Sequence, residues 1–434
     1  MAQIVLAPLL LGGARPWAIA ILSIMSGLGI LAVCITRKQI SIPRYLIRIW
    51  GVAVVMLGWS LLQSLPIWPM QDYPFNATQI ALYPNAWMGL AANLIWLIAT
   101  ITLSSLLAQG RSQTLLNGAI KVVIASSALQ VGLAALASTM DWQTTFWFGK
   151  SAHLDDWTGS FANRNAFGIF LGFGLLGGLY LFAQNKAQGI GRRLDQSGGL
   201  LALALIFAVA LLESHSRSAV ALTLIGTLIF LTLNTPQTTF KVIGKRALFV
   251  GFGILALIIL IDITSPELST RFIELARSDL IQRDDAWHTA ILAIQDRPIT
   301  GFGFDSVALV MGHFATAGLN TNAHWFSSHN LLLDAAIMFG IPATLTVLTA
   351  LGLMATNAVI CAPNGTIRAF VLALVSMAMI GSLIGWVMSM PALILPIAIA
   401  IMACREAAPA RTLAMHQPAD PMAQSPVPDQ TASR

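Results

Sequence analysis

Long apolar segments, separated by short polar ones, follow one another along almost the whole chain. A helix needs about 20 apolar residues to cross the hydrocarbon core of a bilayer, and about twelve segments come near that length. Because the segments are continuous rather than alternating, they predict helices and exclude the strands of a barrel. The expected spans are residues 4–13 (short), 17–35, 46–65, 86–107, 115–137, 165–183, 200–212 (short), 218–233, 247–263, 330–356, 368–388 and 391–404.

The composition supports the same fold class. Only 10% of the 434 residues are charged and 56% are hydrophobic, whereas about 25% of an ordinary soluble domain is charged. A soluble protein of this size cannot cover so much apolar surface with polar groups. The sequence therefore predicts an all-α polytopic membrane protein. The three cysteines are too few for a disulfide framework.

Lysine and arginine occur mainly in every second loop. The loop between the second and third expected spans is basic, whereas the next loop, residues 66–85, contains neither residue. Because basic loops stay on the cytoplasmic side, this pattern predicts a multi-pass inner-membrane protein with both termini in the cytoplasm. Residues 1–404 form the expected membrane domain, and residues 405–434, rich in proline and alanine, form an expected disordered cytoplasmic tail.

One connection, residues 264–329, is far longer than the others, and we call it the long loop. Loops of this length are usually functional, and the charge pattern places this one outside the cytoplasm. Within it, Trp287, Ile291 and Ile294 recur at helical spacing. They predict an amphipathic helix on the outer membrane surface, with this apolar stripe turned toward the lipid. The histidines of the loop lack the spacing of paired metal ligands, so no metal site is predicted.

A polar tip, residues 213–218, separates the seventh and eighth expected spans. Because the seventh segment is short, the tip is expected to lie below the membrane surface, in a cavity. Ionisable groups at that depth are costly and mark functional sites. Arg217 is a candidate phosphate-binding residue, since a guanidinium binds phosphate bidentately, with Glu213 as its expected counter-ion. The alternative is a simple turn whose arginine reaches the lipid headgroups.

Arg283 and His329 are the candidate partners of Arg217. Arg283 lies one turn before Trp287 and is expected to point into the same cavity; alternatively it forms a surface ion pair with Asp284 or Asp279. His329 stands where the tenth span begins. A helix N-terminus disfavours imidazolium, so a neutral His329 is predicted to accept a proton from a hydroxyl group.

The simpler role for the segment around His329 is helix capping, with Ser327 or Ser328 as the cap. Asp334 is then expected to pair with Asn330 at i, i+4. Before the sixth span, Asn163 and Asn165 are expected either to cap the helix or to bind sugar hydroxyl groups. The chain has no phosphate-binding glycine loop with lysine and serine or threonine, which argues against ATP-driven work. Its basic balance indicates topology and anionic lipid rather than nucleic acid.

Five motifs, in this order, resemble those of the O-antigen ligase and Wzy-type polymerase superfamily of bacterial envelope glycosyltransferases. They are Pro-Leu-Leu-Leu-Gly-Gly-Ala-Arg-Pro-Trp at 8–17, Gly-Ser-Phe-Ala-Asn-Arg-Asn-Ala-Phe at 159–167, Ser-His-Ser-Arg-Ser at 214–218, Pro-Ile-Thr-Gly-Phe-Gly at 298–303 after Arg283 and Trp287, and Ser-His-Asn-Leu-Leu at 328–332. The family more often has Glu or Gln where Asp334 stands.

The resemblance implies a GT-C-like fold with the active site facing the periplasm. The donor would be a glycan on undecaprenyl diphosphate, and the acceptor a sugar of lipid A–core or of a lipid-linked repeat unit. Without metal or cofactor, Arg217 and Arg283 would stabilise the diphosphate and His329 would orient or deprotonate the acceptor hydroxyl. Inversion at the anomeric carbon is expected. The implied substrate-binding residues are Asn163, Asn165, His215, Trp287 and Asn330.

Two acts remain open within this family: ligation of a finished glycan, and polymerisation of repeat units. A different class is a transporter or flippase of lipid-linked saccharides. Such a protein would be expected to carry ionisable groups along its spans and to show internal repeats. The charge of this chain is instead concentrated at one membrane face, which favours an enzyme.

Overall fold

The computed structural model describes residues 1–68, 78–145, 148–150, 154–185, 190–234, 283–319 and 325–407. These residues are helical or irregular, and their only strand-like pairing is an isolated bridge between Thr144 and Gly149. The all-helical prediction is therefore confirmed for the described part of the chain. The expected span at 247–263 and most of the tail lie outside the described residues.

The helices follow one another with short connections. In chain order they are α1 (Ala2–Leu9), η1 (Leu11–Gly13), α2 (Pro16–Thr36), α3 (Arg44–Ser64), α4 (Trp87–Ala108), α5 (Ser112–Thr139), α6 (Arg164–Gln184), α7 (Ile190–Glu213), α8 (Arg217–Leu233), α11 (Val307–His313), α12 (Leu331–Phe339), α13 (Ile341–Cys361), α14 (Gly365–Ile384), η2 (Val387–Ser389) and α15 (Pro391–Ala407). A further helix covers residues 283–296.

Eight helices in the described part are long and apolar enough to cross a membrane. They are α2 to α7, α13 and α14. The helix α8 is apolar but shorter, and α15 is of the same length as α8. The polytopic membrane architecture is confirmed, whereas the expected number of about twelve spans is not.

The first expected span, residues 4–13, is wrong. This segment forms α1, which has only eight residues and is therefore about 12 Å long. A 3₁₀ turn follows it. The helix α1 ends at Leu9, and the 3₁₀ turn contains Gly12 and Gly13 with φ angles of 74° and 77°. They also lie close to Met390 and Pro391, which start α15. The segment is thus a short helix packed inside the bundle.

The seventh expected span is longer than predicted. The helix α7 has 24 residues, and its apolar part from Leu194 to Glu213 is 20 residues long. The helix extends through the polar residues before 200, which the apolar pattern excluded from the expected segment. The argument that placed the tip below the membrane surface because this span is short is therefore wrong.

The tenth expected span, residues 330–356, is two helices. The chain breaks at Gly340, which has φ 79° and ψ 165°, and Pro342 stands in the first turn of α13. A side chain at Gly340 would overlap the carbonyl group of Ile299. The span is therefore α13, and α12 is a nine-residue helix in front of it.

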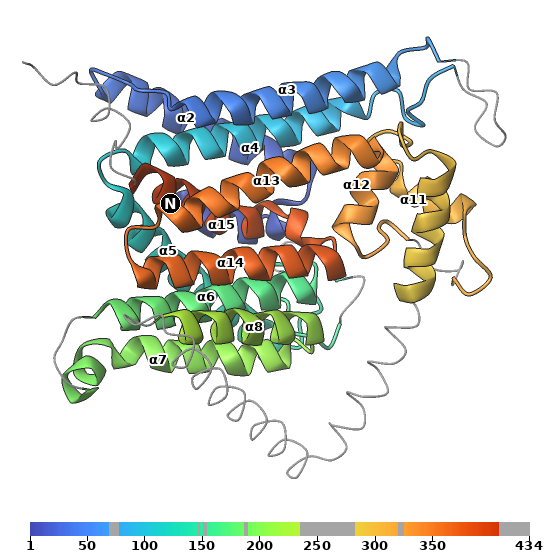
Figure 1. Ribbon diagram of the computed structural model, residues 1–434. Helices are drawn as coiled ribbons and strands as arrows, with labels where there is room; N and C mark the ends of the chain where they lie inside the picture. Colours follow the sequence, from blue (N-terminus) through green and yellow to red (C-terminus); the bar gives the residue numbers. More distant parts are fainter. Residues whose placement is uncertain are drawn as a thin grey trace, which may run out of the picture.

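The long helices run side by side along one direction (Figure 1). In this view α2, α3 and α4 lie along one side of the bundle, α6, α7 and α8 along the other, and α13, α14 and α15 between them. The helix α6 is the most enclosed of the candidate spans, with 72% of its apolar window buried. Its Gly168 would place a Cβ 2.6 Å from that of Ala219 on α8, so only glycine allows this close approach.

Candidate functional site

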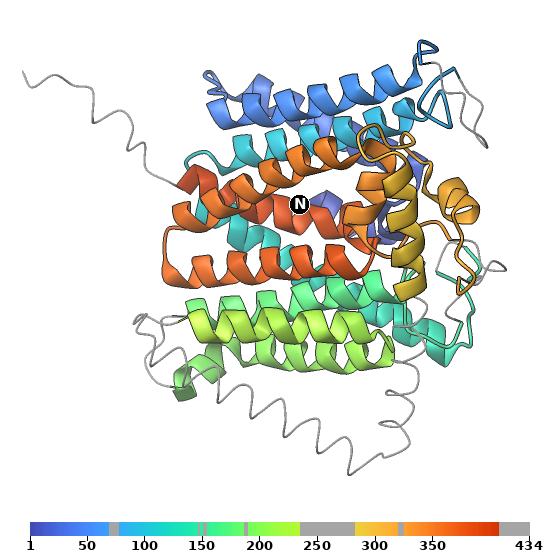
Figure 2. The same cartoon turned by 45° about the vertical axis from the view of Figure 1, so that its right-hand side comes forward.

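The elements that carry the predicted site residues gather at one end of the bundle, which we call the site end (Figures 1 and 2). Arg217 is the first residue of α8, Arg283 is the first described residue of the helix 283–296, and His329 immediately precedes the cap of α12. The helices α12 and α8 both pack against α14. The fold thus brings three segments together that are far apart in the sequence.

The tip is a tight turn between α7 and α8. His215 has a left-handed φ of 50°, a conformation that a residue with a Cβ adopts only when neighbours hold it. Ser216 caps α8, because its Oγ accepts a hydrogen bond from the Ala219 amide at 3.2 Å. The same hydroxyl donates to Asn165 Oδ1 at 2.6 Å. These contacts fix the direction in which Arg217 leaves the turn.

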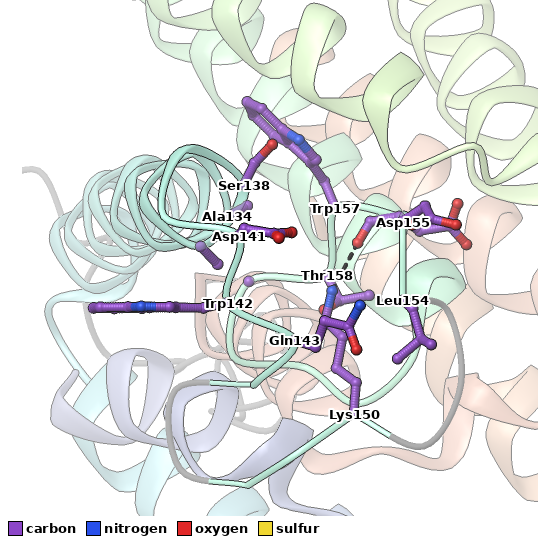
Figure 3. Close-up of a pocket in the computed structure, with 13 residues that line it drawn as sticks. Ala134, Ser138, Asp141, Trp142, Gln143, Lys150, Leu154, Asp155, Trp157 and Thr158 are labelled. Carbon is purple, nitrogen blue, oxygen red and sulfur yellow. Dashed lines mark hydrogen bonds between the residues drawn. The ribbon is translucent and has the colours of Figure 1, made fainter.

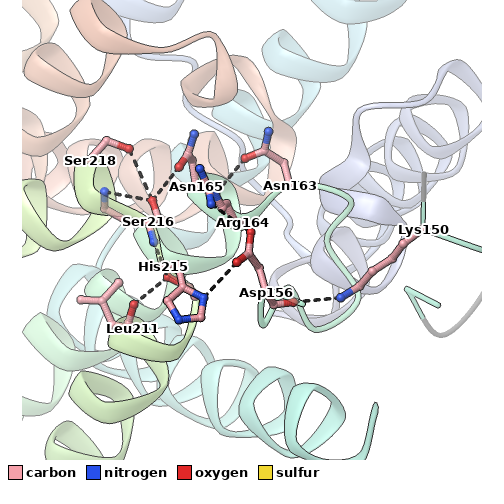
Figure 4. Close-up of polar contacts among 11 residues, drawn as sticks. Lys150, Asp156, Asn163, Arg164, Asn165, Leu211, His215, Ser216 and Ser218 are labelled. Carbon is pink, nitrogen blue, oxygen red and sulfur yellow. Dashed lines mark hydrogen bonds and ion pairs between the residues drawn. The ribbon is translucent and has the colours of Figure 1, made fainter. Parts of the chain in front are cut away.

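Asp156, in the loop before α6, is the residue that ties this loop to the tip (Figure 4). Its carboxylate binds Arg164 Nη1 at 3.0 Å and His215 Nδ1 at 2.9 Å. The backbone adds a bond from the Trp157 amide to the Glu213 carbonyl at 3.2 Å. Asp156 was not predicted from the sequence, because its partner His215 is 59 residues away and no local motif joins the two.

The expected counter-ion of Arg217 is wrong. Glu213 is exposed and forms no ion pair with Arg217 within the residues that the structure describes. Its contribution to the tip is the backbone carbonyl that Trp157 reaches.

Asn163 and Asn165 occupy the start of α6, as the capping hypothesis predicted for this segment. The Asn163 side chain accepts hydrogen bonds from the amides of Asn165 at 2.8 Å and Ala166 at 3.2 Å. Asn165 instead holds Ser216 of the tip. Both asparagines therefore contribute to the shape of the site end, and their contact with a sugar stays a prediction.

The segment before α12 is organised by Asp334, for which no special role was predicted. Its side chain is buried, with an exposed fraction of 4%. It accepts hydrogen bonds from the Ser328 amide at 2.8 Å, from Ser328 Oγ at 2.7 Å and from Ser327 Oγ. Burial raises the pKa of Asp334 above the usual aspartate value, although these hydrogen bonds act in the opposite direction.

His329 is held in a left-handed conformation with a φ of 58°. Its amide donates to Ser327 Oγ at 3.0 Å, and its ring lies edge-on to Trp325 with 5.7 Å between centroids. Asp334 therefore determines the position of His329 through the two serines. The predicted caps are wrong: Asn330 caps α12 by accepting from Leu332 at 3.0 Å. The expected side-chain pairing of Asp334 with Asn330 is also replaced by the serine contacts.

Residues 298–303, which we call the clamp, attach the long loop to α12. The amides of Phe302 and Gly303 donate to the carbonyls of Ile337 at 2.8 Å and Met338 at 2.9 Å. The side chain of Gln63, on α3, donates to the Thr300 carbonyl at 2.6 Å. The clamp thus satisfies the last carbonyls of α12, which would otherwise lack partners at a helix C-terminus.

The helix 283–296 packs its face of small residues against the rest of the protein. The buried residues are Ala286, Thr289, Ala290 and Ala293, whereas Ile291 has an exposed fraction of 43%. Small side chains allow the helix to pack closely on α11 and the clamp. An exposed Ile291 is compatible with a stripe that faces lipid, so this orientation of the helix stays a prediction. Trp287 is partly buried, and its indole nitrogen has no hydrogen-bond partner among the described residues.

Within the described ranges, no three His, Cys, Asp or Glu side chains are placed together so that they could hold a metal ion. Metal independence stays a prediction. The predicted catalytic groups at the site end are the guanidinium groups of Arg217 and Arg283 and the imidazole of His329, with a second imidazole, His215, in the tip.

Residues 202–348 match a family model described as O-antigen ligase. The matched segment includes Arg217, Arg283 and His329 and confirms the resemblance to this family over that part of the chain. It begins inside α7 and ends inside α13, so it spans the tip, the clamp and α12. No curated protein matches the sequence.

Proposed function

We propose that the protein is an inner-membrane glycosyltransferase with a GT-C-like architecture whose site end faces the periplasm. It moves a glycan from undecaprenyl diphosphate to a sugar hydroxyl group, either of lipid A–core or of a lipid-linked repeat unit. The observation that carries this proposal is the O-antigen ligase match over residues 202–348. Within that segment, Arg217 and Arg283 both lie at the site end, where Arg217 begins α8 and Arg283 is the first described residue of the helix 283–296.

The positive-inside pattern supports the orientation. The basic loop before α3 lies at the end of the bundle opposite the site end, as does the loop that follows α4. A lipid-linked donor has its diphosphate at the membrane surface, where helices that end at the site end would meet it. The donor also brings its own energy in the glycosyl phosphate bond, so the reaction needs no ATP.

In the proposed reaction, the acceptor oxygen forms a bond to the anomeric carbon while the bond from that carbon to the diphosphate oxygen breaks. Arg217 and Arg283 stabilise the charge that develops on the leaving diphosphate, since a guanidinium keeps its charge and binds phosphate oxygens bidentately. His329 accepts the acceptor proton. A single displacement of this kind inverts the anomeric configuration, and no metal ion takes part in it.

The remaining predicted residues have roles in placing the sugars. His215, Asn163 and Asn165 belong to the tip and the start of α6, and Trp287 and Asn330 lie on the two elements that carry Arg283 and His329. In the proposal they line the path of the donor and acceptor. Asp334 is a positioning residue, because it acts on His329 through Ser327 and Ser328.

The test is complementation of a deletion strain with Arg217→Ala, Arg283→Ala and His329→Ala, followed by glycan gels and extraction of lipid-linked intermediates. Removing one transition-state cation is expected to lower the rate about 100- to 1000-fold. Arg368→Ala is the matched control, because Arg368 is exposed near the start of α14 at the opposite end.

The accumulated intermediate separates the possible activities. Long glycans left on undecaprenyl diphosphate indicate a ligase, and single repeat units indicate a polymerase. A donor that stays in the inner leaflet would instead indicate a flippase and would overturn the proposal. Normal glycans in all three variants would overturn the site assignment, and a retained anomeric configuration in the product would exclude a single displacement.

A further inference from the structure

The loop between α5 and α6 encloses a cavity that the proposed displacement does not use. Its volume is about 190 Å³, below the several hundred Å³ typical of a site for a drug-sized ligand. The cavity therefore has room for one small ring rather than for a chain of rings. It lies at the site end, between the end of α5 and the start of α6.

The cavity wall is mixed in chemistry (Figure 3). In this view Asp141 and Asp155 stand on opposite sides, Gln143 and Lys150 lie below the centre, and Trp157 lies above it. The wall thus offers carboxylate acceptors, an amide that donates and accepts, and an indole ring. A sugar residue has the complementary groups, because its hydroxyls donate and accept around the rim of a ring with apolar C–H faces.

The wall also contains one buried hydroxyl group, that of Thr158, without a hydrogen-bond partner among the described residues. Thr158 is 1% exposed. A buried hydroxyl without a partner costs about 1–3 kcal/mol. Such a group beside a cavity is expected where a polar ligand or water completes the hydrogen bonding.

The charge of the wall restricts the ligand. The Asp156 carboxylate is paired with Arg164, and those of Asp141 and Asp155 still outnumber the single ammonium group of Lys150. Lys150 Nζ already donates to the Asp156 carbonyl at 2.9 Å, and burial lowers its pKa below the usual lysine value. An anionic sugar would be repelled here, whereas an uncharged or amino-bearing sugar would not.

The cavity is joined directly to the tip. Asp156 and Trp157 line it, and the same two residues bind His215 and Glu213 through the side-chain and backbone contacts described above. Figure 4 shows Lys150, Asp156 and His215 in one connected series of polar contacts. A ligand in the cavity would therefore lie one layer of side chains from the turn that carries Arg217.

We propose that this cavity is a subsite for one uncharged or amino-bearing sugar residue, held by Asp141, Asp155 and Gln143 beside the indole of Trp157. That the sugar belongs to the donor glycan or the acceptor of a transfer reaction rests on the proposed function. Binding of the sugar itself does not, and it can be measured without any transfer.

The test is saturation-transfer NMR on the full chain in nanodiscs, with glucose, N-acetylglucosamine, glucosamine and glucuronate as probes. The first three are expected to bind at millimolar concentration, and glucuronate is not. Asp141→Asn with Asp155→Asn should weaken binding about tenfold, as expected for the loss of two charged hydrogen-bond acceptors. Asp195→Asn is the matched control, because Asp195 is exposed near the end of α7 that lies away from the tip.

Binding in the Arg217→Ala variant separates the two proposals. Sugar binding that persists in this variant supports the subsite. If the wild type binds sugar but transfers no glycan, the proposed function fails and the subsite stands. No binding of any uncharged or amino sugar would overturn the subsite. Unchanged binding in the double variant, or tighter binding of glucuronate than of glucose, would also overturn it.

A transfer assay then identifies the source of the sugar. A rise of about tenfold in the KM for the acceptor, with kcat unchanged, assigns the cavity to the acceptor. The same rise in the KM for the donor assigns it to the donor glycan. Unchanged KM values for both substrates in the double variant would contradict a role of the cavity in transfer.

Discussion

The tip and the segment before α12 each present a predicted site residue, but they are held in different ways. The tip is held by half-exposed polar contacts, in which the side chain of His215 is 52% exposed and that of Asp156 13% exposed. The segment before α12 is held by the buried carboxylate of Asp334, while the far end of α12 is held by the backbone of the clamp. One region is secured at the surface, and the other from inside the fold.

The difference indicates a division of work between the two regions. Exposed ion pairs contribute about 0–1 kcal/mol each, so the contacts of Asp156 can rearrange when a charged donor arrives at the tip. A buried carboxylate with three donors holds one geometry, because breaking its hydrogen bonds leaves polar groups without partners. We therefore expect an adaptable diphosphate side around Arg217 and a rigid acceptor side around His329.

The largest effect is expected for Gly340→Ala. The new Cβ would overlap the Ile299 carbonyl group, and the φ of 79° disfavours any residue with a side chain. We expect a loss of about 3 kcal/mol of stability, together with most of the activity, because α12 and the clamp would separate. Thermal unfolding in detergent measures the change.

The matched control for this substitution is Gly352→Ala on α13, where no atom lies within 4 Å of the added Cβ. That variant should be as stable as the wild type or slightly more stable, since alanine favours a helix. Equal melting temperatures for the two variants would contradict the rigid attachment of α12.

The next effect is expected for Asp334→Ala. It leaves the Ser327 hydroxyl and the Ser328 amide without their acceptor, whereas the Ser328 hydroxyl keeps the Asn330 carbonyl, and the change should cost about 2 kcal/mol of stability. Because His329 loses its support, kcat should fall more than the folded fraction does, with little change in KM. Asp334→Glu keeps the carboxylate, and its activity should exceed that of the alanine variant. If kcat follows the folded fraction in both variants, Asp334 has a structural role alone.

Features that depend on neighbouring residues in the chain could be predicted from the sequence, whereas contacts between distant segments could not. The spans α2 to α6 follow from long apolar segments, and Arg217, Arg283 and His329 from short motifs. The break at Gly340 could not be predicted, because the apolar pattern continues across it and the cause is the clamp, which comes from another part of the chain. Asp156 was not predicted either, because its partner His215 comes from a distant part of the chain.

The smallest effect is expected for Asp156→Asn. The amide still accepts one hydrogen bond but loses the charge that binds Arg164 and His215, which should cost less than about 1 kcal/mol of stability. The KM for the donor should rise about threefold, because the tip becomes less ordered, while kcat changes little. Steady-state transfer kinetics measure both. A loss of stability as large as that of Asp334→Ala would remove the distinction between the two regions.

The most direct measurement is single-turnover transfer from an undecaprenyl-diphosphate glycan by the purified protein in nanodiscs. The wild type and the control Arg368→Ala should transfer at the same rate. Arg217→Ala, Arg283→Ala and His329→Ala should each be at least about 100-fold slower while remaining folded. Transfer by these three variants at the wild-type rate would contradict the placement of the reaction at the site end.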